Sequence, residues 1–525
     1  MAPVLAESDA NVVVSAPTGA GKTALFEMAL VRLLFDPDRA HTGAARKAVY
    51  ISPTKALCEE RFLDWSTRLA KMDPTLKVAL VTGDADAGQA SSCDIASADV
   101  IVTTPEKWDG STRNCDSESL IRSVNLLMID EVHHLGDKSS GSTLEAVLCR
   151  MMKTQRVAVG DGNGDEAGFR SDMRSDMRIV AVSATLPNIA DIATFIEAAG
   201  NAYSFDSSYR AVPIEVHVSD QGSVETNQFM FDRGLSKDVP DILRKFSNDR
   251  PSIVFCHIRK DTEHLAESLA REYATEEQKA ELSKTAEGTK VKALRICLLS
   301  GIAYHHAGME VQDRHLVEKA FSEGHLRCIC ATSTLAMGVN LPAHLVVIRG
   351  TNAWRGAGSG YQDIDPGTLL QMMGRAGRPG FDSSGTAVIM TDSKSKPRYE
   401  KITSSDGSSL ETLESHLLGR LVEIVNTEVS RGVITNKSQA IDWVKGTFFF
   451  ARVRKNMHDK SEEQQDAYLD QECDGVLKKL EGAGIIEFKE DGLGINPLPV
   501  CHVMCKHMVT FDDMKAIMDL SLIHI

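Results

Sequence analysis

The sequence lacks an excess of positive charge: among 525 residues, 58 Lys and Arg stand against 73 Asp and Glu, which gives a formal net charge of −15. This balance excludes a surface that is positively charged throughout and binds nucleic acid by its overall charge. A local groove that binds a strand through hydroxyls, backbone amides and a few cations stays possible. Long apolar runs are missing too, and nothing approaches the ~20 apolar residues of a membrane-spanning helix. The N-terminal residues show no basic segment followed by an apolar one, so no secretion signal is expected.

Cysteine occurs an odd number of times, 11, and is scattered along the chain. Such usage is typical of reduced, buried thiols in a cytosolic or nuclear protein. Cys328 and Cys330, like Cys501 and Cys505, lack a second pair at the spacing of a zinc site. Core thiols are therefore the favoured interpretation, and a zinc site is the alternative.

Strand-like apolar runs alternate with amphipathic stretches in two consecutive series. The first series, from residue 11 to about 205, is NVVVSA, KAVYIS, KVALVTG, DVIVTT, VNLLMID and RIVAVSAT. The second, which ends near Thr391, is PSIVFCH, ALRICLLS, HLRCICAT, HLVVIRG and GTAVIMT. This rhythm is typical of parallel α/β sheets and predicts two lobes, 1–205 and 206–400. The Gly- and Asp-rich stretch 157–178 is expected to be a surface insertion in the first lobe.

Beyond Lys401 the pattern becomes helical, because apolar residues recur at spacings of three, four and seven: Leu410, Leu413, Leu417, Leu421 and Ile424. The later stretch VLKKLEGAGIIEFKEDGLGIN predicts a helix that ends at a Gly, followed by two short strands around Asp491-Gly492. Helices followed by such a hairpin favour a winged-helix domain over 401–500. A generic helical linker domain is the alternative.

The segment SAPTGAGKT, from Ser15 to Thr23, follows an apolar strand and opens an amphipathic helix. This is the context of a phosphate-binding loop, in which small residues let backbone amides wrap a phosphate at a helix N-terminus. Lys22 would reach the β- and γ-phosphates and Thr23 would ligate Mg²⁺. Ala16 replaces the usual first Gly, and a chance Gly-rich turn is the alternative.

Asp130 and Glu131 follow the apolar strand VNLLMI directly. One carboxylate can hold the Mg²⁺ shell while its neighbour orients or deprotonates the attacking water, which suits hydrolysis. The structural alternative is that these residues are only the acidic N-cap of a helix. His133 can couple such a site to its surroundings or be a structural histidine, and the structural role is the better interpretation of His134.

In QMMGRAGRPG, Gln371, Arg375 and Arg378 are spaced i, i+4 and i+7, so a helix would place them on one face. Guanidinium groups directed at a γ-phosphate neutralise charge in the transition state. The alternative is a pair of arginines on a solvated helix face. The flanking glycines and proline favour the functional interpretation.

The ordered blocks APTGAGKT, SPTKAL, TPEKWD, DEVHH, SATLPN, VFCH, HHAG, ATSTLAMGVNLPAH and QMMGRAGRPGFD resemble the superfamily 2 DExH helicases of the Ski-two-like branch. Within that branch the chain is most similar to the meiotic crossover DNA helicases, the Mer-three (HFM-one) kind. The resemblance implies two tandem RecA-like lobes, a winged-helix domain and, over 501–525, the start of a truncated helical (Sec63-like) domain. The adenine-recognising glutamine segment of the family is absent, so the chain is expected to be a fragment or an incomplete gene product.

The resemblance also implies roles for matching residues. The ATP site would comprise Ala16, Pro17, Thr18, Gly19, Ala20, Gly21, Lys22, Thr23, Asp130, Glu131, Gln371, Arg375 and Arg378, with Thr23 and Asp130 at Mg²⁺. Three residues would couple ATP hydrolysis to movement of the lobes: Ser183, Thr185 and His133. Gly338 and Asn340 would contact both the nucleotide and the nucleic-acid strand. Residues of the nucleic-acid track would be Pro53, Thr54, Lys55, Thr104, Pro105, His306 and Thr332, which grip phosphates without reading bases.

Trp354 and Tyr361 flank a Gly-rich stretch where related helicases carry a strand-separating hairpin. An aromatic side chain there can stack on the last base pair. An ordinary surface hairpin with a half-buried Trp is the alternative. Trp108, in TPEKWD, is expected to be a core residue.

The resemblance as a whole implies a nuclear protein that acts as a monomeric motor. Its expected activity is that of an ATP-dependent 3′-to-5′ DNA helicase of meiotic recombination, with ATP and Mg²⁺ as cofactors, DNA as partner and no membrane association. An RNA-remodelling helicase and a nucleotide-binding regulatory cassette remain alternatives. Because the helical domain is cut short, the chain is expected to hydrolyse ATP but to unwind with poor processivity.

Overall fold

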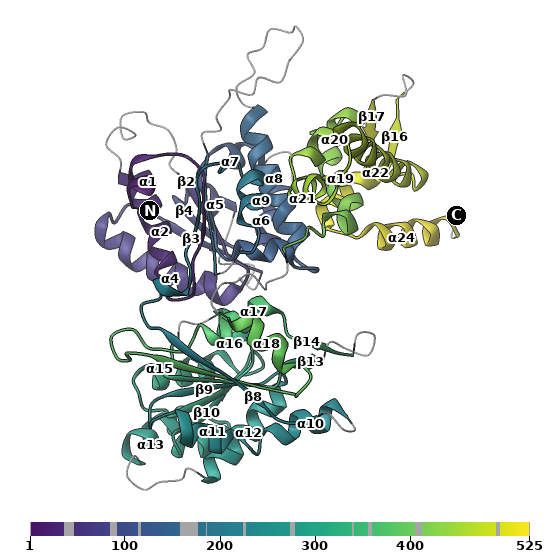
Figure 1. Ribbon diagram of the computed structural model, residues 1–525. Coiled ribbons are helices and arrows are strands. Elements are labelled where there is room, and N and C mark those ends of the chain that lie inside the picture. The colour runs from purple at the N-terminus through teal and green to yellow at the C-terminus, as the bar shows by residue number, and fades with distance from the viewer. Residues whose placement is uncertain are drawn as a thin grey trace. The chain divides into compact units, whose positions relative to one another are not determined.

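The fold was obtained as a computed structural model and divides into two compact units, each described by itself (Figure 1). The structure describes residues 2–35, 47–83, 92–113, 117–157, 177–184, 186–223, 227–272, 279–338, 341–354, 360–404, 412–489 and 494–523. Unit 1 contains residues 1–15, 23–204 and 412–525, and unit 2 contains 205–411 together with the short loop 16–22. We call 1–204 the first lobe, 205–411 the second lobe and 412–525 the C-terminal module. Among the described residues, none of the helices combines the length and hydropathy that a bilayer crossing requires.

The first lobe is built on a seven-stranded sheet in which every neighbouring pair is parallel. Its strands, in spatial order, are β3 (Val78–Val81), β4 (Val100–Thr103), β2 (Lys47–Ile51), β5 (Val124–Ile129), β6 (Arg178–Ser183), β1 (Val12–Ser15) and β7 (Ala202–Ser204). All six predicted strand runs are confirmed, whereas β7 was not predicted. Most of these strands are buried along their whole length, as expected of a parallel sheet covered on both faces.

Helices connect and cover these strands. They are α1 (Ala2–Glu7), α2 (Lys22–Phe35), α4 (Lys55–Met72), α5 (Ser92–Ser97), α6 (Pro105–Thr112), α7 (Glu118–Arg122), the 3₁₀ turn η2 (Val132–Gly136), α8 (Gly141–Val157) and α9 (Ile189–Phe195). Trp108 of α6 is fully buried and its indole N–H lies 3.4 Å from the Met151 sulfur, which confirms it as a core residue. The stretch predicted as a surface insertion lies, over 158–176, outside the described residues.

The second lobe has a six-stranded sheet, again parallel throughout. Its strands, in spatial order, are β10 (Ile302–His305), β11 (Cys328–Ala331), β9 (Ser252–Phe255), β12 (Leu345–Arg349), β15 (Gly385–Thr391) and β8 (Ile214–Asp220). The two parallel α/β sheets confirm the expected pair of RecA-like lobes. Strands β8 and β10 were not predicted.

One predicted strand of the second lobe is wrong. The run ALRICLLS, 293–300, belongs to helix α14 (Lys292–Leu299), and the strand that follows it is β10. Its buried side chains recur at helical spacing: Leu294, Cys297 and Leu298. A short apolar run cannot be assigned to helix or strand from its composition, and here the period of three and four decides for the helix.

The remaining elements of the second lobe surround its sheet. They are the 3₁₀ turn η3 (Ser207–Tyr209), α10 (Gln228–Leu235), α11 (Val239–Phe246), α12 (Arg259–Glu272), α13 (Lys279–Glu287), α15 (Val311–Ser322), α16 (Thr334–Gly338), β13 (Asn352–Trp354), β14 (Tyr361–Asp363), α17 (Pro366–Met373) and α18 (Lys396–Thr403). Cys328 and Cys330 lie on β11. The nine cysteines whose side chains the structure describes are buried and form no disulfide, in agreement with core thiols.

The C-terminal module is helical with one hairpin. It contains η4 (Leu417–Arg420), α19 (Leu421–Ser430), α20 (Lys437–Lys445), α21 (Phe448–Asn456), α22 (Glu462–Gly482), β16 (Ile486–Phe488), β17 (Ile495–Pro497), α23 (Pro499–His507) and α24 (Phe511–Ile523). The antiparallel pairing of β16 with β17 confirms the predicted hairpin, whose turn at 490–493 lies outside the described residues.

The predicted leucine-rich helix starts later than expected. Leu410 lies outside the described residues, Leu413 lies in an irregular segment, and regular helix begins only at Leu417 and Leu421. Leu413 instead packs beside Gly136 of the first lobe, where a Cβ on that glycine would come within 3.0 Å of the leucine side chain. Its apolar side chain therefore serves the first lobe rather than a helix of the module.

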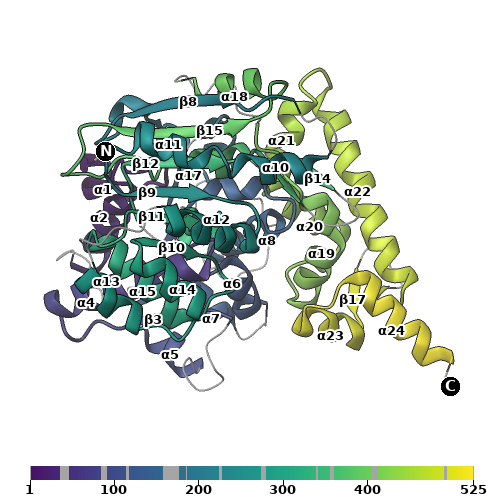
Figure 2. The same ribbon diagram turned by 90° about the horizontal axis from the view of Figure 1, so that it is seen from below.

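The C-terminal module belongs to the same compact unit as the first lobe, and α18 groups with the second lobe. The assignment of 401–500 as a winged-helix domain stays a prediction. Helix α8 lies beside the module in both views (Figures 1 and 2). Phe448 of α21 is fully buried in the core of the first lobe, 6.0 Å from the ring of Phe195. The shared core explains why the two segments form one unit.

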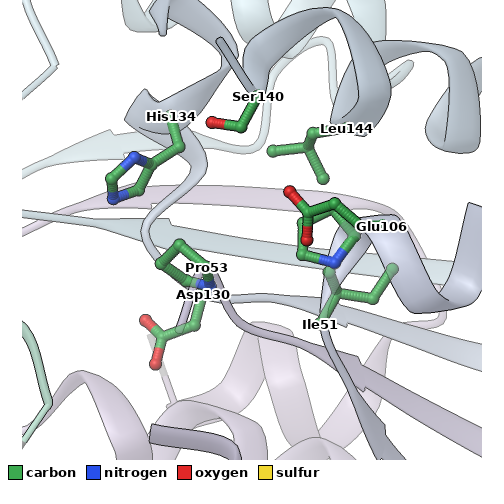
Figure 3. Close-up of a pocket in the computed structure, with 8 residues that line it drawn as sticks. Ile51, Pro53, Glu106, Asp130, His134, Ser140 and Leu144 are labelled. Carbon is green, nitrogen blue, oxygen red and sulfur yellow. The ribbon is translucent and has the colours of Figure 1, made fainter. Parts of the chain in front are cut away.

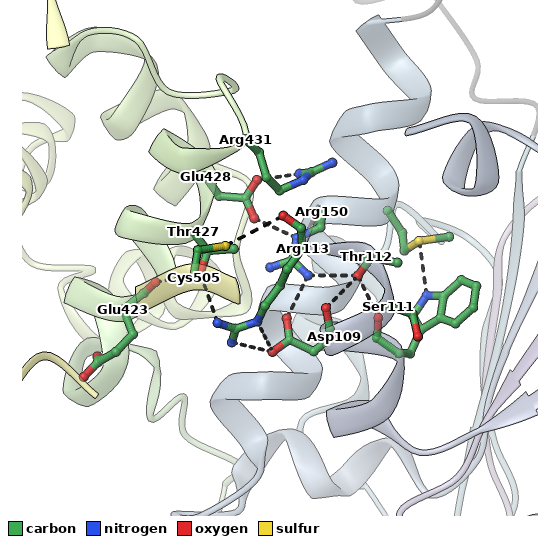
Figure 4. Close-up of polar contacts among 12 residues, drawn as sticks. Asp109, Ser111, Thr112, Arg113, Arg150, Glu423, Thr427, Glu428, Arg431 and Cys505 are labelled. Atoms are coloured by element: carbon green, nitrogen blue, oxygen red, sulfur yellow. Dashed lines mark hydrogen bonds and ion pairs between the residues drawn. The ribbon is translucent and has the colours of Figure 1, made fainter. Parts of the chain in front are cut away.

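Buried charges also join the module to the first lobe (Figure 4). The Arg150 guanidinium donates to Asp109 and to Glu428 of α19, at 2.8 Å each, and all three side chains are almost completely buried. Arg113 donates to Asp109 at 2.9 Å, and Arg431 donates to Glu428 at 2.7 Å. Burial opposes the charge of Arg150, but the carboxylates of Glu428 and Asp109 outweigh it and raise the pKa of this arginine.

Candidate functional site

The predicted phosphate-binding loop occupies the predicted context, between the buried strand β1 and helix α2, which begins at Lys22. Gly19 and Gly21 both have a φ of 83°, a backbone conformation that favours glycine. The Lys22 ammonium donates to the carbonyl oxygen of Ala16 at 2.9 Å, so it folds back over the loop. The residues of this loop, 16–22, are thus arranged as a turn whose amides precede a helix N-terminus.

Asp130 and Glu131 follow β5 at the carboxyl end of the sheet. The Tyr50 hydroxyl donates to Oδ2 of Asp130 at 2.6 Å, and the backbone N–H of Glu131 donates to Oδ1 at 3.0 Å. Glu131 has a φ of 51°, in the left-handed region that most residues avoid. The chain therefore turns sharply here, and the Glu131 side chain makes no N-cap bond to η2, unlike the bland alternative of an acidic helix cap.

Two of the three residues expected to couple hydrolysis to movement lie in contact. Nδ1 of His133 is 2.8 Å from Oγ of Ser183, at the end of β6, and 3.3 Å from Oε2 of Glu131. Thr185, the third, lies outside the described residues. His134 bonds instead to Asp137 at 2.5 Å, within its own turn, as expected of a structural histidine.

A small pocket opens at the carboxyl ends of β2, β4 and β5 (Figure 3). It is lined by Ile51, Pro53, Pro105, Glu106, Asp130, His134, Ser140 and Leu144. Asp130 belongs to the proposed nucleotide site, whereas Pro53 and Pro105 belong to the blocks predicted to follow a nucleic-acid strand. The structure therefore brings both sets of residues of the first lobe together at one edge of its sheet, the usual location of ligand sites in open α/β sheets.

The predicted strand-binding residues of the first lobe differ in exposure. Lys55, the first residue of α4, is exposed and can meet a phosphate, while the Thr54 hydroxyl accepts from the Leu57 N–H as the cap of that helix. Thr104 and Pro105 are both buried at the start of α6. Lys55 is therefore the exposed cation among these residues, and the nucleic-acid contacts of the first lobe stay a prediction.

The predicted strand-binding residues of the second lobe are also mostly buried. Nε2 of His306 lies 3.0 Å from a carboxylate oxygen of Glu263, and the Thr332 hydroxyl lies 2.8 Å from that of Thr334. His306 and Thr332 are 5% and 8% exposed, so each side chain offers little surface to a ligand. Their assignment as nucleic-acid contacts remains a prediction.

The predicted shared helix face of Gln371, Arg375 and Arg378 is wrong, because α17 ends at Met373. Only Gln371 lies on the helix, where it is buried, and both arginines follow in a turn. The turn needs Gly377, whose φ is 88° and whose Cβ would come within 2.6 Å of Val212. The rule of i, i+4 and i+7 therefore fails where glycines end a helix.

The side chains of Arg375 and Arg378 form hydrogen bonds with different partners. Nε of Arg375 donates to the carbonyl oxygen of Ala336 at 3.1 Å. Nε and Nη2 of Arg378 donate to the two carboxylate oxygens of Asp382 at 2.9 and 3.0 Å, a bidentate pair. Gly338 ends α16, and Asn340 lies outside the described residues.

Trp354 and Tyr361 face each other across a hairpin of β13 and β14, at the place where the resemblance implies a hairpin. Their ring centroids are 5.2 Å apart at 64°, and Trp354 is 51% exposed. The connecting residues 355–359 lie outside the described residues. The exposed indole fits both the strand-separating role and the alternative of a half-buried surface aromatic.

Sequence reasoning missed Tyr50 and Asp382. Tyr50 is fully buried, and burial, followed by the charge of Asp130, raises the pKa of its phenol well above the ordinary value. For Asp382, burial acts to raise the pKa but the bonds from Arg378 outweigh it, and the net pKa is lowered. A single hydroxyl inside the apolar strand KAVYI was the available signal for Tyr50.

The residues present fit a nucleotide with Mg²⁺. An ammonium, a threonine hydroxyl, a carboxylate and loop amides form the donor set, and Mg²⁺ prefers such hard oxygen ligands beside phosphates. A Cβ built on Gly19 or Gly21 would meet none of the atoms that the structure describes within 4 Å, so the loop backbone borders open space among these residues. Thr23 and Asp130 would hold the ion and its waters, and Lys22 would bind the phosphates.

Comparison with known proteins agrees with this geometry. Residues 1–192 match the family model of the DEAD/DEAH box helicase, and residues 235–380 match that of the helicase conserved C-terminal domain. The probable ATP-dependent DNA helicase HFM1 of Homo sapiens is 37% identical over 98% of this chain and 35% of its own length. The ATP-dependent DNA helicase MER3 of Saccharomyces cerevisiae is 35% identical over 98% of this chain and 41% of its own length.

Activating signal cointegrator 1 complex subunit 3 of Mus musculus is 36% identical over 94% of this chain and 22% of its own length. The chain thus spans about a third of the length of the HFM1 proteins it matches. The two helicase models match in the order of the two parallel sheets. The chain therefore contains a DEAD/DEAH box helicase domain and a helicase conserved C-terminal domain, and it is similar to the HFM1 and MER3 proteins along nearly its whole length.

Proposed function

We propose that the chain is an ATP-dependent DNA helicase that couples ATP hydrolysis to movement along a single strand and to duplex opening, with 3′-to-5′ polarity. The printed names of the HFM1 and MER3 relatives, as ATP-dependent DNA helicases, support the activity and the polymer. The polarity and a nuclear role in meiotic recombination and crossover formation rest on the resemblance of the motif blocks alone.

One observation carries the proposal most directly: Asp130, Glu131, His133 and Ser183 form a connected polar set at the carboxyl end of one sheet. The acidic pair is suited to water activation, and the histidine joins it to the end of another strand. Such a connection gives hydrolysis a route to the rest of the first lobe, which a purely structural acidic turn would not need.

In this mechanism the residues of the chain act as follows. Lys22 binds the phosphates. The Asp130 carboxylate is oriented by the two hydrogen bonds that it accepts, and Glu131 orients the attacking water and accepts its proton. When bound, Mg²⁺ neutralises charge on the β- and γ-phosphate oxygens. Arg375 and Arg378 of the second lobe are proposed to neutralise the charge that develops on the transferred phosphate.

The strand-binding part of the proposal rests on backbone amides, hydroxyls and the exposed Lys55, because the net charge of −15 provides no general attraction for a polyanion. Trp354, exposed on its hairpin, would stack on the last base pair and hold it open, a contact worth about 1–3 kcal/mol. We propose that the motor acts as a monomer.

The test combines hydrolysis with displacement. ATP turnover is measured with and without single-stranded DNA for the wild type and for Lys22→Ala, and DNA and RNA duplexes with 3′ or 5′ tails are offered in parallel. Stimulated turnover that Lys22→Ala abolishes, with displacement of 3′-tailed DNA, is the expected result. Turnover that is unchanged by Lys22→Ala would overturn the enzyme, opening of RNA alone would overturn the polymer, and nucleotide binding without turnover would indicate a regulatory cassette.

A further inference from the structure

We propose that Tyr50 is a positioning residue that sets the affinity of the nucleotide site for Mg²⁺ by holding the carboxylate of Asp130. This inference rests on the proposed function, in which Asp130 holds the metal and its waters. It adds a residue from β2, a strand that neither carries the phosphate loop nor precedes the acidic pair.

The hydrogen bonds around Asp130 restrain both carboxylate oxygens. The Tyr50 hydroxyl donates to Oδ2 at 2.6 Å, and the Glu131 N–H donates to Oδ1 at 3.0 Å. Two donors on two different oxygens restrain rotation of the carboxylate about its last torsion. Each oxygen keeps further lone pairs for the metal shell, so the bonds orient the ligand without using it up.

The Tyr50 ring cannot easily move away from this position. It is fully buried, and it is held edge-on by Phe26, with centroids 5.5 Å apart, and by Trp65, with centroids 5.2 Å apart. Both neighbours are themselves almost completely buried. A phenol packed in this way presents its hydroxyl in one direction, and Asp130 lies in that direction.

The backbone supports the same arrangement. Strands β2 and β5 are neighbours in the sheet, with Tyr50 in register with Met128, and the N–H of Asp130 donates to the carbonyl of Ile51 at 2.9 Å. Asp130 therefore has its main chain and its side chain both tied to β2. The two aromatic neighbours of Tyr50 come from α2, which begins at Lys22, and from α4, which begins at Lys55. The orientation of one metal ligand thus depends on packing against both helices.

Removal of the hydroxyl with retention of the ring isolates the proposed effect. For Tyr50→Phe we measure binding of a fluorescent ATP analogue in EDTA and during titration with free Mg²⁺. We expect unchanged affinity in EDTA and an increase of about 10-fold in the Mg²⁺ concentration for half-maximal effect, as is typical when the partner of a metal ligand is lost. In steady-state hydrolysis, saturating Mg²⁺ should restore kcat while the Mg²⁺ requirement stays raised.

Tyr399→Phe is the matched control, because this tyrosine of the second lobe is also buried and its hydroxyl also contacts an aspartate, Asp363, at 3.4 Å. It should leave the Mg²⁺ requirement within about twofold of the wild type. Phe26→Leu tests packing, because it removes an edge contact and keeps the hydroxyl. If Phe26→Leu shifts the Mg²⁺ requirement and Tyr50→Phe does not, packing sets the requirement without the hydroxyl and the inference is overturned.

The failures are distinguishable. A wild type without Mg²⁺-dependent nucleotide binding contradicts the proposed function, whereas a normal wild type with an unaltered Tyr50→Phe contradicts only the role of Tyr50. Equal loss of affinity in EDTA and in Mg²⁺ also contradicts it. If Tyr50→Phe does not fold, 3-fluorotyrosine introduced at position 50 keeps the hydroxyl: its ¹⁹F resonance should shift when Mg²⁺ is added to the ADP complex, and the absence of a shift overturns the inference.

Discussion

Nδ1 of His133 lies 2.8 Å from Oγ of Ser183, although 50 residues separate the two in the sequence. The same nitrogen is 3.3 Å from Oε2 of Glu131. One imidazole nitrogen is therefore within reach of both the acid that is proposed to activate water and a buried serine at the end of a neighbouring strand. A change of tautomer or of rotamer at this histidine would exchange one partner for the other.

Ser183→Ala should separate hydrolysis from unwinding. The substitution removes the hydroxyl that His133 contacts and leaves Glu131 intact. We therefore expect ATP turnover to fall by less than about 3-fold and strand displacement to fall by about 10-fold or more. The second effect is that of losing roughly one hydrogen bond in a coupled network. Both are measured on one 3′-tailed DNA duplex. Ser430→Ala, which removes a comparable 2.9 Å contact with His502 in the C-terminal module, should change neither. Parallel loss of both activities in Ser183→Ala would contradict a coupling role.

Arg150→Met should destabilise the unit formed by the first lobe and the C-terminal module. The variant leaves Asp109 and Glu428 buried without their shared partner, and loss of one member of a buried pair typically costs about 3–5 kcal/mol. Thermal unfolding followed by circular dichroism should show a lower midpoint. Arg122→Ala removes a more exposed ion pair with Glu118 and should shift the midpoint little, by less than about 1 kcal/mol. Similar shifts of the thermal midpoint in the two variants would show that the buried charges contribute no more to stability than the exposed ion pair does.

Glu145 should make stability depend on pH. It accepts hydrogen bonds from Ser415 and from the Phe449 N–H, at 2.6 Å each, and its burial raises its pKa from 4.5 to about 7 despite those bonds. Between these two values the folded state binds the proton more tightly than the unfolded state, so this contribution to stability is complete below pH 4.5 and is lost as the pH rises through 7.

Glu145→Gln tests that sign directly. The neutral amide should remove this contribution to the pH dependence. Between about pH 5 and 8, the unfolding midpoint of the wild type should therefore fall relative to that of the variant. The expected difference is equivalent to roughly 2–4 kcal/mol. The midpoints are compared in matched buffers at one ionic strength. Curves that stay parallel across this range would show that Glu145 keeps an ordinary pKa in the folded protein.

Gly377→Ala should destabilise the second lobe more than Gly324→Ala. Both glycines have a positive φ, 88° and 79°, so both substitutions strain the backbone. Only at Gly377 would the added Cβ come within 2.6 Å of Val212, whereas none of the described atoms is within 4 Å at Gly324. We expect an additional cost of about 1–3 kcal/mol from this clash, measured as the difference between the two thermal midpoints. Equal midpoints would mean that the turn after α17 can shift to make room.

The fold of both lobes could be predicted where strands are continuous apolar runs, because a parallel sheet buries both faces of its strands. The prediction failed where the run also fits a helix, as in α14. It also failed where a strand is only partly buried, as in β8, whose apolar and polar residues alternate instead of forming a continuous apolar run. The helix predicted through Leu413 failed because an apolar side chain can serve a neighbouring lobe, which local spacing does not reveal.

The candidate site shows the same division. The phosphate loop and Asp130–Glu131 are local patterns with a chemical requirement at each position, so the sequence is sufficient to find them. Tyr50 and Asp382 act through partners that are 80 and 4 residues away, and only folding shows that the first reaches Asp130 and that the second holds Arg378. The shared face of Gln371, Arg375 and Arg378 was predicted wrongly because a glycine-rich turn replaced the expected helix.

Phe448 completes the core of the first lobe although more than two hundred residues of the second lobe separate it from that lobe in the chain. A fragment that ends at residue 411 would retain both segments that match the helicase domain models, but it would lose the Phe448 side chain from the core of the first lobe. It would also expose Arg150 and Glu145 to water, although both side chains are buried in the full chain. Such a fragment should expose an apolar patch and aggregate when expressed alone, so the smallest stable fragment extends beyond the segments 1–192 and 235–380 that match the two helicase domain models.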